Sequence, residues 1–177
     1  RQVLAQSASA ALGRKTDQLI IDVLDAGSNS NNIVHGSAAL TLAKALTVYE
    51  EFGSADIPDD GQRYFIVSPA AWADLLQIDQ FSRAEYVGEA DLPFAGGLTA
   101  KRWLGFMFFT HSGLSLSSTT RDCHAYHKSA VGLATGADIR TEINYIPEKV
   151  SNLITSYMSM AAVMIDNLGA IEVQVTE

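Results

Sequence analysis

The first 24 residues repeat apolar side chains at the spacing of an α-helix. Leu4, Ala8, Leu12 and then Leu19 recur at this period, while polar and charged side chains occupy the opposite positions. The predicted helix would be roughly 33 Å long at the helical rise of 1.5 Å per residue. A rod of that length needs a sheet or another helix beside it, because isolated helices are only marginally stable in water.

A second helix follows a turn. The Gly, Ser and Asn residues of segment 27–32 end the first helix, and Ser37 is a predicted N-cap for a helix that runs to Phe52. Gly53 is the predicted stop of that helix. The acidic segment 54–61 then indicates a crossing between two lobes.

The next segment predicts a short buried strand that leads into a helix. Tyr64 to Val67 is apolar, and Ser68-Pro69 supplies a hydroxyl N-cap followed by proline at the first helical position. Residues 79–100 show no sustained period, so we expect a long irregular loop or ribbon there. Loops longer than about 15 residues in compact domains are usually functional or disordered.

The second half of the chain is rich in strand patterns. Strands are predicted over residues 98–102, 103–109, 122–128 and 139–145, the last of them half-buried. A helical turn is expected over 129–134. The apolar stretch 153–165, a turn at 166–169 and the alternating residues 171–175 together predict a C-terminal hairpin.

Composition narrows the function. The 177 residues fit one domain or two small lobes that share strands, and 47% hydrophobic residues allow a sizeable core. The net charge of −8, with Lys and Arg spread thinly, makes non-specific nucleic-acid binding a poor fit. No apolar run is long enough for a membrane span, and no signal peptide is visible.

The densest chemical cluster is Cys123, His124 and His127, with His111 nearby. On a strand, Cys123 and His127 face one side and His124 the other, so the three do not converge on a zinc ion. Cys123 and His127 would also lie about 13 Å apart by strand rise, too far for a nucleophile pair. We therefore expect a buried structural cysteine, no metal site, no catalytic residue and no cofactor.

Two groups of carboxylates remain. The sequence places Asp56, Asp59 and Asp60 in one loop and Glu85, Glu89 and Asp91 in another. Paired acids can act in acid–base chemistry or hold a cation, but solvated loops are the simpler interpretation. In an assembly the second group would pair with basic residues of a neighbour, such as those at positions 83, 101 and 102.

The order of these elements resembles the major capsid protein of tailed bacteriophages, with the Hong Kong 97-type fold. The resemblance covers nearly the whole chain and rests on Ser68-Pro69-Ala70-Ala71-Trp72, the strand 103–108 with its internal Gly105, and the returning strands of 138–177. Segments 77–82, 125–132 and 142–145 are similar to a podovirus-like branch.

The resemblance implies an α+β fold with a long spine helix and two lobes. Residues 1–55 and 126–177 would form the peripheral lobe, and residues 56–125 the apical lobe. The family's N-terminal arm and extended loop have no counterpart here. The chain is therefore expected to be a truncated core that is a monomer or a small ring in solution.

The implied function is structural. Many copies, arranged as hexamers and pentamers, would tile an icosahedral phage or prophage shell that encloses DNA without sequence-specific binding. Scaffold and portal proteins would be partners. The protein would be found in the host cytoplasm before assembly and then in the virion. Two alternatives stay open: a subunit of an encapsulin-like compartment, and a small acidic enzyme or ligand-binding protein that uses Cys123 and His127.

Two regions are predicted to contact neighbouring subunits. Loops within 54–60 and 112–120 are expected to meet around a local symmetry axis, and the ribbon 81–97 to contact an adjacent subunit. The predicted contact residues are Asp59, Asp60, Phe81, Arg83, Glu85, Tyr86, Glu89, Ser115 and Ser117.

Overall fold

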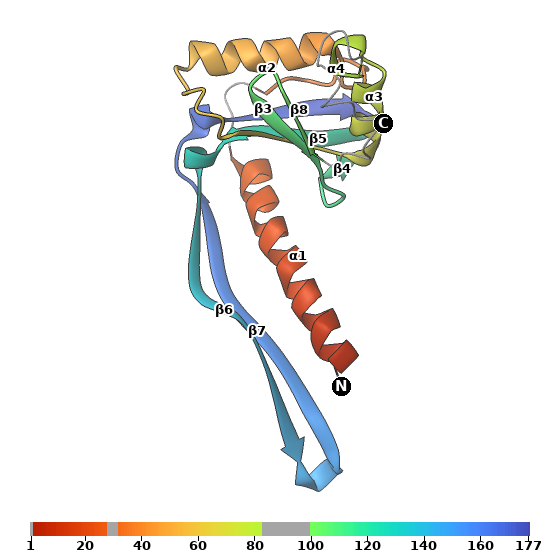
Figure 1. Ribbon diagram of the computed structural model, residues 1–177, viewed down its shortest axis with the longest axis vertical. Helices are drawn as coiled ribbons and strands as arrows, with labels where there is room; N and C mark the ends of the chain where they lie inside the picture. The colour runs from red at the N-terminus through yellow and green to blue at the C-terminus, as the bar shows by residue number, and fades with distance from the viewer. Residues whose placement is uncertain (1, 28–31, 83–99) are drawn as a thin grey trace.

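The computed structural model describes residues 2–27, 32–82 and 100–177. They form a compact unit built on a six-stranded sheet and an extended part in which a two-stranded hairpin runs beside the first helix (Figure 1). The helices are α1 (Gln2–Ala26), α2 (Leu42–Ser54), α3 (Pro69–Leu76) and α4 (Asp79–Ser82). The strands are β1 (Arg63–Val67), β2 (Ala100–Trp103), β3 (Phe106–Thr110), β4 (Leu116–Ser117), β5 (Thr120–His127), β6 (Val131–Ile146), β7 (Ser151–Met164) and β8 (Ala170–Thr176).

The compact sheet has the strand order β2-β3-β1-β5-β4, and β8 pairs with β5. One face of this sheet carries most of the hydrophobic core, because alternate side chains of each strand point to it. Phe65 and Phe108 stack on that face with ring centroids 4.7 Å apart. Phe52 of α2 meets Phe106 edge-on at 5.1 Å, and Phe81 of α4 meets Phe108 at 6.1 Å. The short helices therefore cover this face.

The opposite face of the sheet is covered by the C-terminal end of α1. Ile21 and Leu24 of that helix are buried, and Ile66 of β1 is 4% exposed. Phe109 and Tyr126, on the same face, are only half-buried. The helix thus covers part of the face and leaves aromatic side chains at its margin.

The extended part consists of α1 and the β6–β7 hairpin. The strands pair from Val131 with Met164 to Ile146 with Ser151. The Thr16 hydroxyl on α1 lies 3.7 Å from the sulfur atom of Met158 and 3.4 Å from that of Met160, which places the helix along one side of the hairpin. The predicted long first helix is confirmed, and of the two neighbours that the sequence left open, a sheet or another helix, it lies beside a hairpin of strands.

Local signals located α3 correctly. The Ser68 hydroxyl accepts a hydrogen bond from the Ala71 N–H at 3.0 Å, and Pro69 is the first helical residue. The predicted strand pair around Gly105 is also present as β2 and β3, joined by a turn in which Gly105 has a φ of +79°.

The predicted start of α2 was wrong. The helix begins at Leu42 with Thr41 as its N-cap, while Ser37 lies in a turn with a φ of +53°. Lys44 explains the difference, because its ammonium group donates to three backbone carbonyls, one of them that of Gln174 in β8. This long-range anchor holds the preceding segment out of helical geometry.

The predicted C-terminal hairpin was also wrong, because β7 pairs with β6 and β8 pairs with β5. The backbone N–H groups of Ile165 and Asp166 both donate to the Ala130 carbonyl, which fixes the end of β7 beside the start of β6. The expected helical turn over 129–134 is limited to Lys128–Ala130, and residues from Val131 onward form the partner strand instead.

The packing also differs from the predicted grouping of residues 1–55 with 126–177. Both α2 and β8 lie with the compact sheet, whereas α1, β6 and β7 make up the extended part (Figure 1). The C-terminal strand joins the sheet because Ile171, Val173 and Val175 alternate with polar residues and fill the core. Which part corresponds to which capsid lobe stays a prediction.

Candidate functional site

The cysteine and histidines that the sequence singled out lie on the two faces of β5, as strand alternation predicted. Cys123 is fully buried, and burial raises the pKa of its thiol to about 12, so the group stays protonated at neutral pH. A protonated buried thiol is a poor nucleophile. Within residues 2–27, 32–82 and 100–177, no group of three or more His, Cys, Asp or Glu side chains is placed to hold a metal ion.

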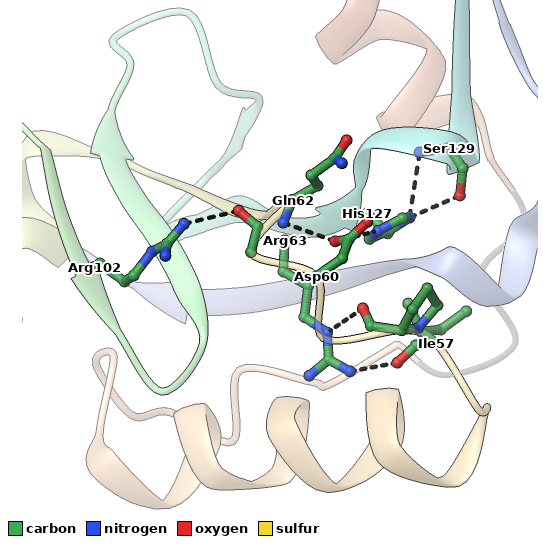
Figure 2. A network of polar contacts seen from close by, with 9 residues as sticks. Ile57, Asp60, Gln62, Arg63, Arg102, His127 and Ser129 are labelled. Atoms are coloured by element: carbon green, nitrogen blue, oxygen red, sulfur yellow. Dashed lines mark hydrogen bonds and ion pairs between the residues drawn. The ribbon is translucent and has the colours of Figure 1, made fainter.

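His127 forms a brace at the end of β5 (Figure 2). Its Nε2 lies 3.1 Å from an Asp60 carboxylate oxygen, and its Nδ1 lies 2.7 Å from the Ser129 hydroxyl. Because the Ser129 backbone N–H also donates to Nδ1, the neutral ring carries its proton on Nε2 and donates it to Asp60. The hydrogen bond from His127, together with one from the Gln62 N–H, holds the pKa of Asp60 below its usual value.

The side chains of Asp60, His127 and Ser129 have the residue types of a hydrolase triad, but their geometry is that of a cap. Ser129 is two residues from His127, and its own backbone N–H binds the same ring nitrogen, which caps the turn Lys128–Ala130. The arrangement joins the loop before β1 to the point where the chain leaves the sheet for the hairpin. It therefore fixes the root of the hairpin.

Two arginines hold the backbone of the acidic loop (Figure 2). Arg63 is 4% exposed, and its guanidinium donates to the carbonyls of Ile57 and Pro58 while it lies over two phenylalanine rings. Arg102 donates to the Gly61 carbonyl at 2.9 Å. Gly61, two residues before β1, has a φ of +79°, a left-handed conformation that favours glycine.

His124 joins the sheet to the spine-like helix α1 on the other face. The ring is fully buried, and its Nε2 lies 2.6 Å from an Asp25 carboxylate oxygen. Burial pushes the pKa of Asp25 upward, but hydrogen bonds with His124 and Ser115 outweigh it, and the net pKa lies below the usual value. The last turn of α1 is thus fixed to β5 by a polar contact.

Asp122 opposes the stability of this region. One of its carboxylate oxygens is buried and has no hydrogen-bond partner in the described part of the chain. Burial, followed by the nearby charges of Glu172 and Asp25, raises the pKa of Asp122 above its usual value. Its ionised form is therefore less favourable in the folded protein than in the unfolded chain.

We expect Asp122→Asn to raise the free energy of unfolding at pH 7, by less than about 1 kcal/mol because the side chain is partly exposed. Because the pKa of Asp122 is higher in the folded protein than in the unfolded chain, its ionisation destabilises the fold. This loss of stability is complete above the folded pKa and absent below the unfolded pKa. The gain should therefore vanish as the pH falls below about 4. Urea titrations at several pH values measure it, with the exposed Asp138→Asn as control. A gain that persists at low pH would refute the electrostatic explanation.

The prediction that Phe81 contacts a neighbouring subunit was wrong. Phe81 is fully buried, and its ring meets Trp72 at 5.6 Å and Trp103 at 5.3 Å. The side chain belongs to the core, because α4 turns it under the end of the sheet, and it presents no surface to a neighbour. Arg83, Glu85, Tyr86 and Glu89, with the rest of the predicted ribbon, lie outside the described residues.

The two predicted contact loops lie at opposite ends of β5 (Figure 1). Asp60 of the first loop meets His127 at the end of β5, and the second loop, which includes exposed Ser115 and Ser117, leads into its first residue, Thr120. Eight residues of strand separate the two ends by about 23 Å. The loops of one subunit therefore do not form a single contact surface, although Asp59 is exposed in the first.

The hairpin carries exposed apolar side chains on both of its faces, which we did not predict from the sequence. Many of its large apolar side chains are more than two-fifths exposed: Leu133, Ile143, Tyr145, Val150, Leu153, Tyr157 and Val163. By the pairing register, Leu153, Tyr157 and Val163 lie on the face away from α1, whereas Leu133, Ile143 and Tyr145 lie on the face of Met158 and Met160. The available signal was the stretch 153–165, which is apolar on both faces of a strand and so requires cover on both. Among the described elements, α1 lies along one side. The predicted half-burial of Ile143 and Tyr145 was wrong, since they are 48% and 59% exposed.

A further negative result concerns membranes. None of the described helices combines the length and apolar composition that a membrane crossing requires.

The chain is similar to known phage capsid proteins in sequence and in structure. A family model described as phage capsid protein matches residues 1–177. A chain of the Mycobacterium phage Che8 structure superposes with a TM-score of 0.73 at 20% identity, over 95% of this chain and 61% of that one. A chain from the capsid of cyanophage P-SCSP1u gives a TM-score of 0.76 at 16% identity, over 100% and 66%.

A more distant match is a chain of an encapsulin complex from Synechococcus elongatus, with a TM-score of 0.57 at 11% identity, over 87% of this chain and 56% of that one. No curated protein sequence gives a significant match. At these identities the structures show the fold, which is the predicted α+β capsid fold, and the chain spans less than two thirds of each of the three. The match of the family model to residues 1–177 shows more than the fold: this chain belongs to the phage capsid protein family.

Proposed function

We propose that this chain is the folded core of a structural subunit, many copies of which build the closed shell of a phage or prophage capsid. The observation that carries the proposal is the exposed apolar surface of the hairpin in a member of the phage capsid family. Monomeric soluble proteins rarely expose large apolar patches, and such patches mark sites of protein association. Catalysis is not part of this proposal.

The hairpin is the main proposed contact with neighbouring copies, and its exposed apolar side chains would be covered in the shell. Asp59 and Asp60 in one loop, and Ser115 and Ser117 in the other, remain proposed contacts. The two loops would face different neighbours because they lie at opposite ends of β5. Individual contacts of this kind are weak. Symmetry repeats them many times, which makes the assembly stable.

We further propose that the compact sheet is the apical lobe and that α1 with the β6–β7 hairpin is the peripheral lobe. Hexamers and pentamers would form the shell with help from scaffold and portal proteins, first in the host cytoplasm and finally in the virion. The net charge of −8 suits a wall that surrounds DNA without binding it tightly.

An encapsulin-like compartment is the second candidate, supported by the encapsulin structure that shares the fold. The contents of the particles distinguish the two. Particles would be isolated from cells that carry the complete viral or proviral gene set, treated with nuclease and opened. We expect protected DNA. Protein cargo without DNA would favour the compartment, and the absence of particles containing this chain would overturn both proposals.

A further inference from the structure

A cavity of about 270 Å³ lies between α1 and the partly covered face of the compact sheet. It is lined by Asp17, Ile20, Ile21, Ile66, Phe109, His111 and Tyr126. Pockets for drug-sized ligands usually measure about 300–1,000 Å³, so this one is slightly smaller and suits a few side chains better than a cofactor. Most of its lining is apolar.

The polar groups of the cavity differ in charge and in hydrogen-bonding role. Asp17 is exposed and brings a carboxylate, and Lys and Arg are missing from the lining residues of the described cavity. The Nδ1 of His111 accepts the Gly113 N–H at 3.0 Å, so the neutral ring has its proton on Nε2 and can donate it. The residues that line the cavity therefore include one acidic acceptor, one imidazole and the phenol of Tyr126, beside apolar side chains.

The tip of the hairpin has the complementary chemistry. Its turn, Pro147–Lys149 followed by Val150, presents a basic and an acidic side chain, Lys149 and Glu148, between two exposed apolar ones. Val150 is 80% exposed, and its φ of +46° is a left-handed conformation that β-branched residues rarely adopt. Strained backbone of this kind often occurs at functional sites.

The tip cannot reach the cavity of its own chain. The hairpin starts at the compact sheet and ends far from it (Figure 1). From Val131 to Ile146, strand rise separates the root from the tip by about 50 Å. The complementary surfaces must therefore meet between different copies.

We propose that the hairpin tip of one copy inserts into the α1–sheet cavity of a second copy. Val150 and Pro147 would cover the apolar floor, Lys149 would pair with Asp17, and Glu148 would accept from His111. The contact joins two different surfaces, so repetition generates a ring when the rotation closes. The inference rests on the proposed self-association of the subunit. It goes further because it assigns the α1–sheet cavity as the binding site for the hairpin tip of another copy.

A charge exchange tests the pairing in the complete protein. We expect Asp17→Lys and Lys149→Asp each to raise the concentration needed for assembly about tenfold, because the loss is repeated at each contact. The double variant should recover to within about threefold of the wild type, as expected for directly coupled residues. The matched control is the double variant Asp22→Lys with Lys149→Asp, because Asp22 is on the same helix but does not line the cavity. Assembly of this control should not recover. Equal assembly of the single variants and wild type would overturn the proposal.

Val150→Gly separates folding from assembly. Glycine adopts a positive φ without strain, so the thermal midpoint of the subunit should stay the same or rise, while assembly weakens about tenfold. A variant that assembles like the wild type would overturn the role of the tip.

Cross-linking distinguishes failure of this contact from failure of the shell. Copies with Val150→Cys are mixed with copies carrying Asp17→Cys or, as control, Asp22→Cys. A mixed disulfide with the first partner that is at least about tenfold above the control supports the contact, since disulfides require Cα atoms within about 7 Å. If wild-type copies form particles but the mixed Cys variants do not cross-link above the control, the contact is overturned and the shell proposal stays intact. The cross-link without particles would do the reverse.

Discussion

Replacing Phe108 by alanine is expected to lower the free energy of unfolding by about 3–5 kcal/mol. Phe108 is 1% exposed and lies at the centre of an aromatic cluster, with Phe65 stacked on it and Phe81, Trp103 and Phe106 around it. The loss combines the removed apolar surface with the cavity left behind, because packed neighbours relax only partly.

Urea unfolding followed by tryptophan fluorescence measures this effect directly. Trp72 and Trp103 both contact Phe81, so their emission reports on the cluster. Tyr49→Ala is the control, because Tyr49 is an aromatic residue on α2 that is 46% exposed, and its loss should change stability by less than about 0.5 kcal/mol. Equal effects of the two substitutions would show that Phe108 is not at the core of the fold.

The second large effect concerns assembly. Leu153→Asp on β7 is expected to prevent particle formation while leaving the unfolding transition almost unchanged. Leu153 is 47% exposed, so aspartate is tolerated in the free subunit, but burial of its charge in the contact between copies would be costly. Each particle contains many such contacts, so the cost of burying the charge is repeated many times in one particle.

Leu46→Asp on α2 is a closely matched control, since Leu46 is also 47% exposed. We expect this variant to assemble. Sedimentation and thermal unfolding of both variants separate assembly from folding. If Leu153→Asp assembles as well as Leu46→Asp does, the face of the hairpin that carries Leu153 is not a contact surface.

Elements with a local cause could be predicted from the sequence. The start of α3 follows from Ser68-Pro69, whose hydroxyl and fixed φ act within one turn. The faces of β5 follow from strand alternation, which correctly placed Cys123 and His127 on one side and separated them from His124. These features need no knowledge of distant residues.

Elements decided by distant contacts could not be predicted. The start of α2 depends on Lys44 and its bond to the Gln174 carbonyl, 130 residues away. The partner of β7 depends on Ala130, whose carbonyl fixes the strand end, since β6 and β8 have similar alternation. Phe81 stands among polar residues, so its burial under the sheet left no local sign.

The site shows the same division. The histidines were located on the right strand, but the pairing of His127 with Asp60 spans 67 positions and follows only from the fold. The exposed apolar side chains of the hairpin had a sequence signal, because both faces of residues 153–165 are apolar. We had assigned residues 153–165 to a hairpin with the C-terminal strand, because adjacent segments usually pair.

An electron cryo-microscopy reconstruction of particles formed by the complete protein tests the proposed shell most directly. We expect a closed icosahedral wall built from copies of this fold, in which the β6–β7 hairpin of each copy lies against a neighbour. A wall built from a different protein, or one in which the hairpins lie free of contact, would contradict the proposal.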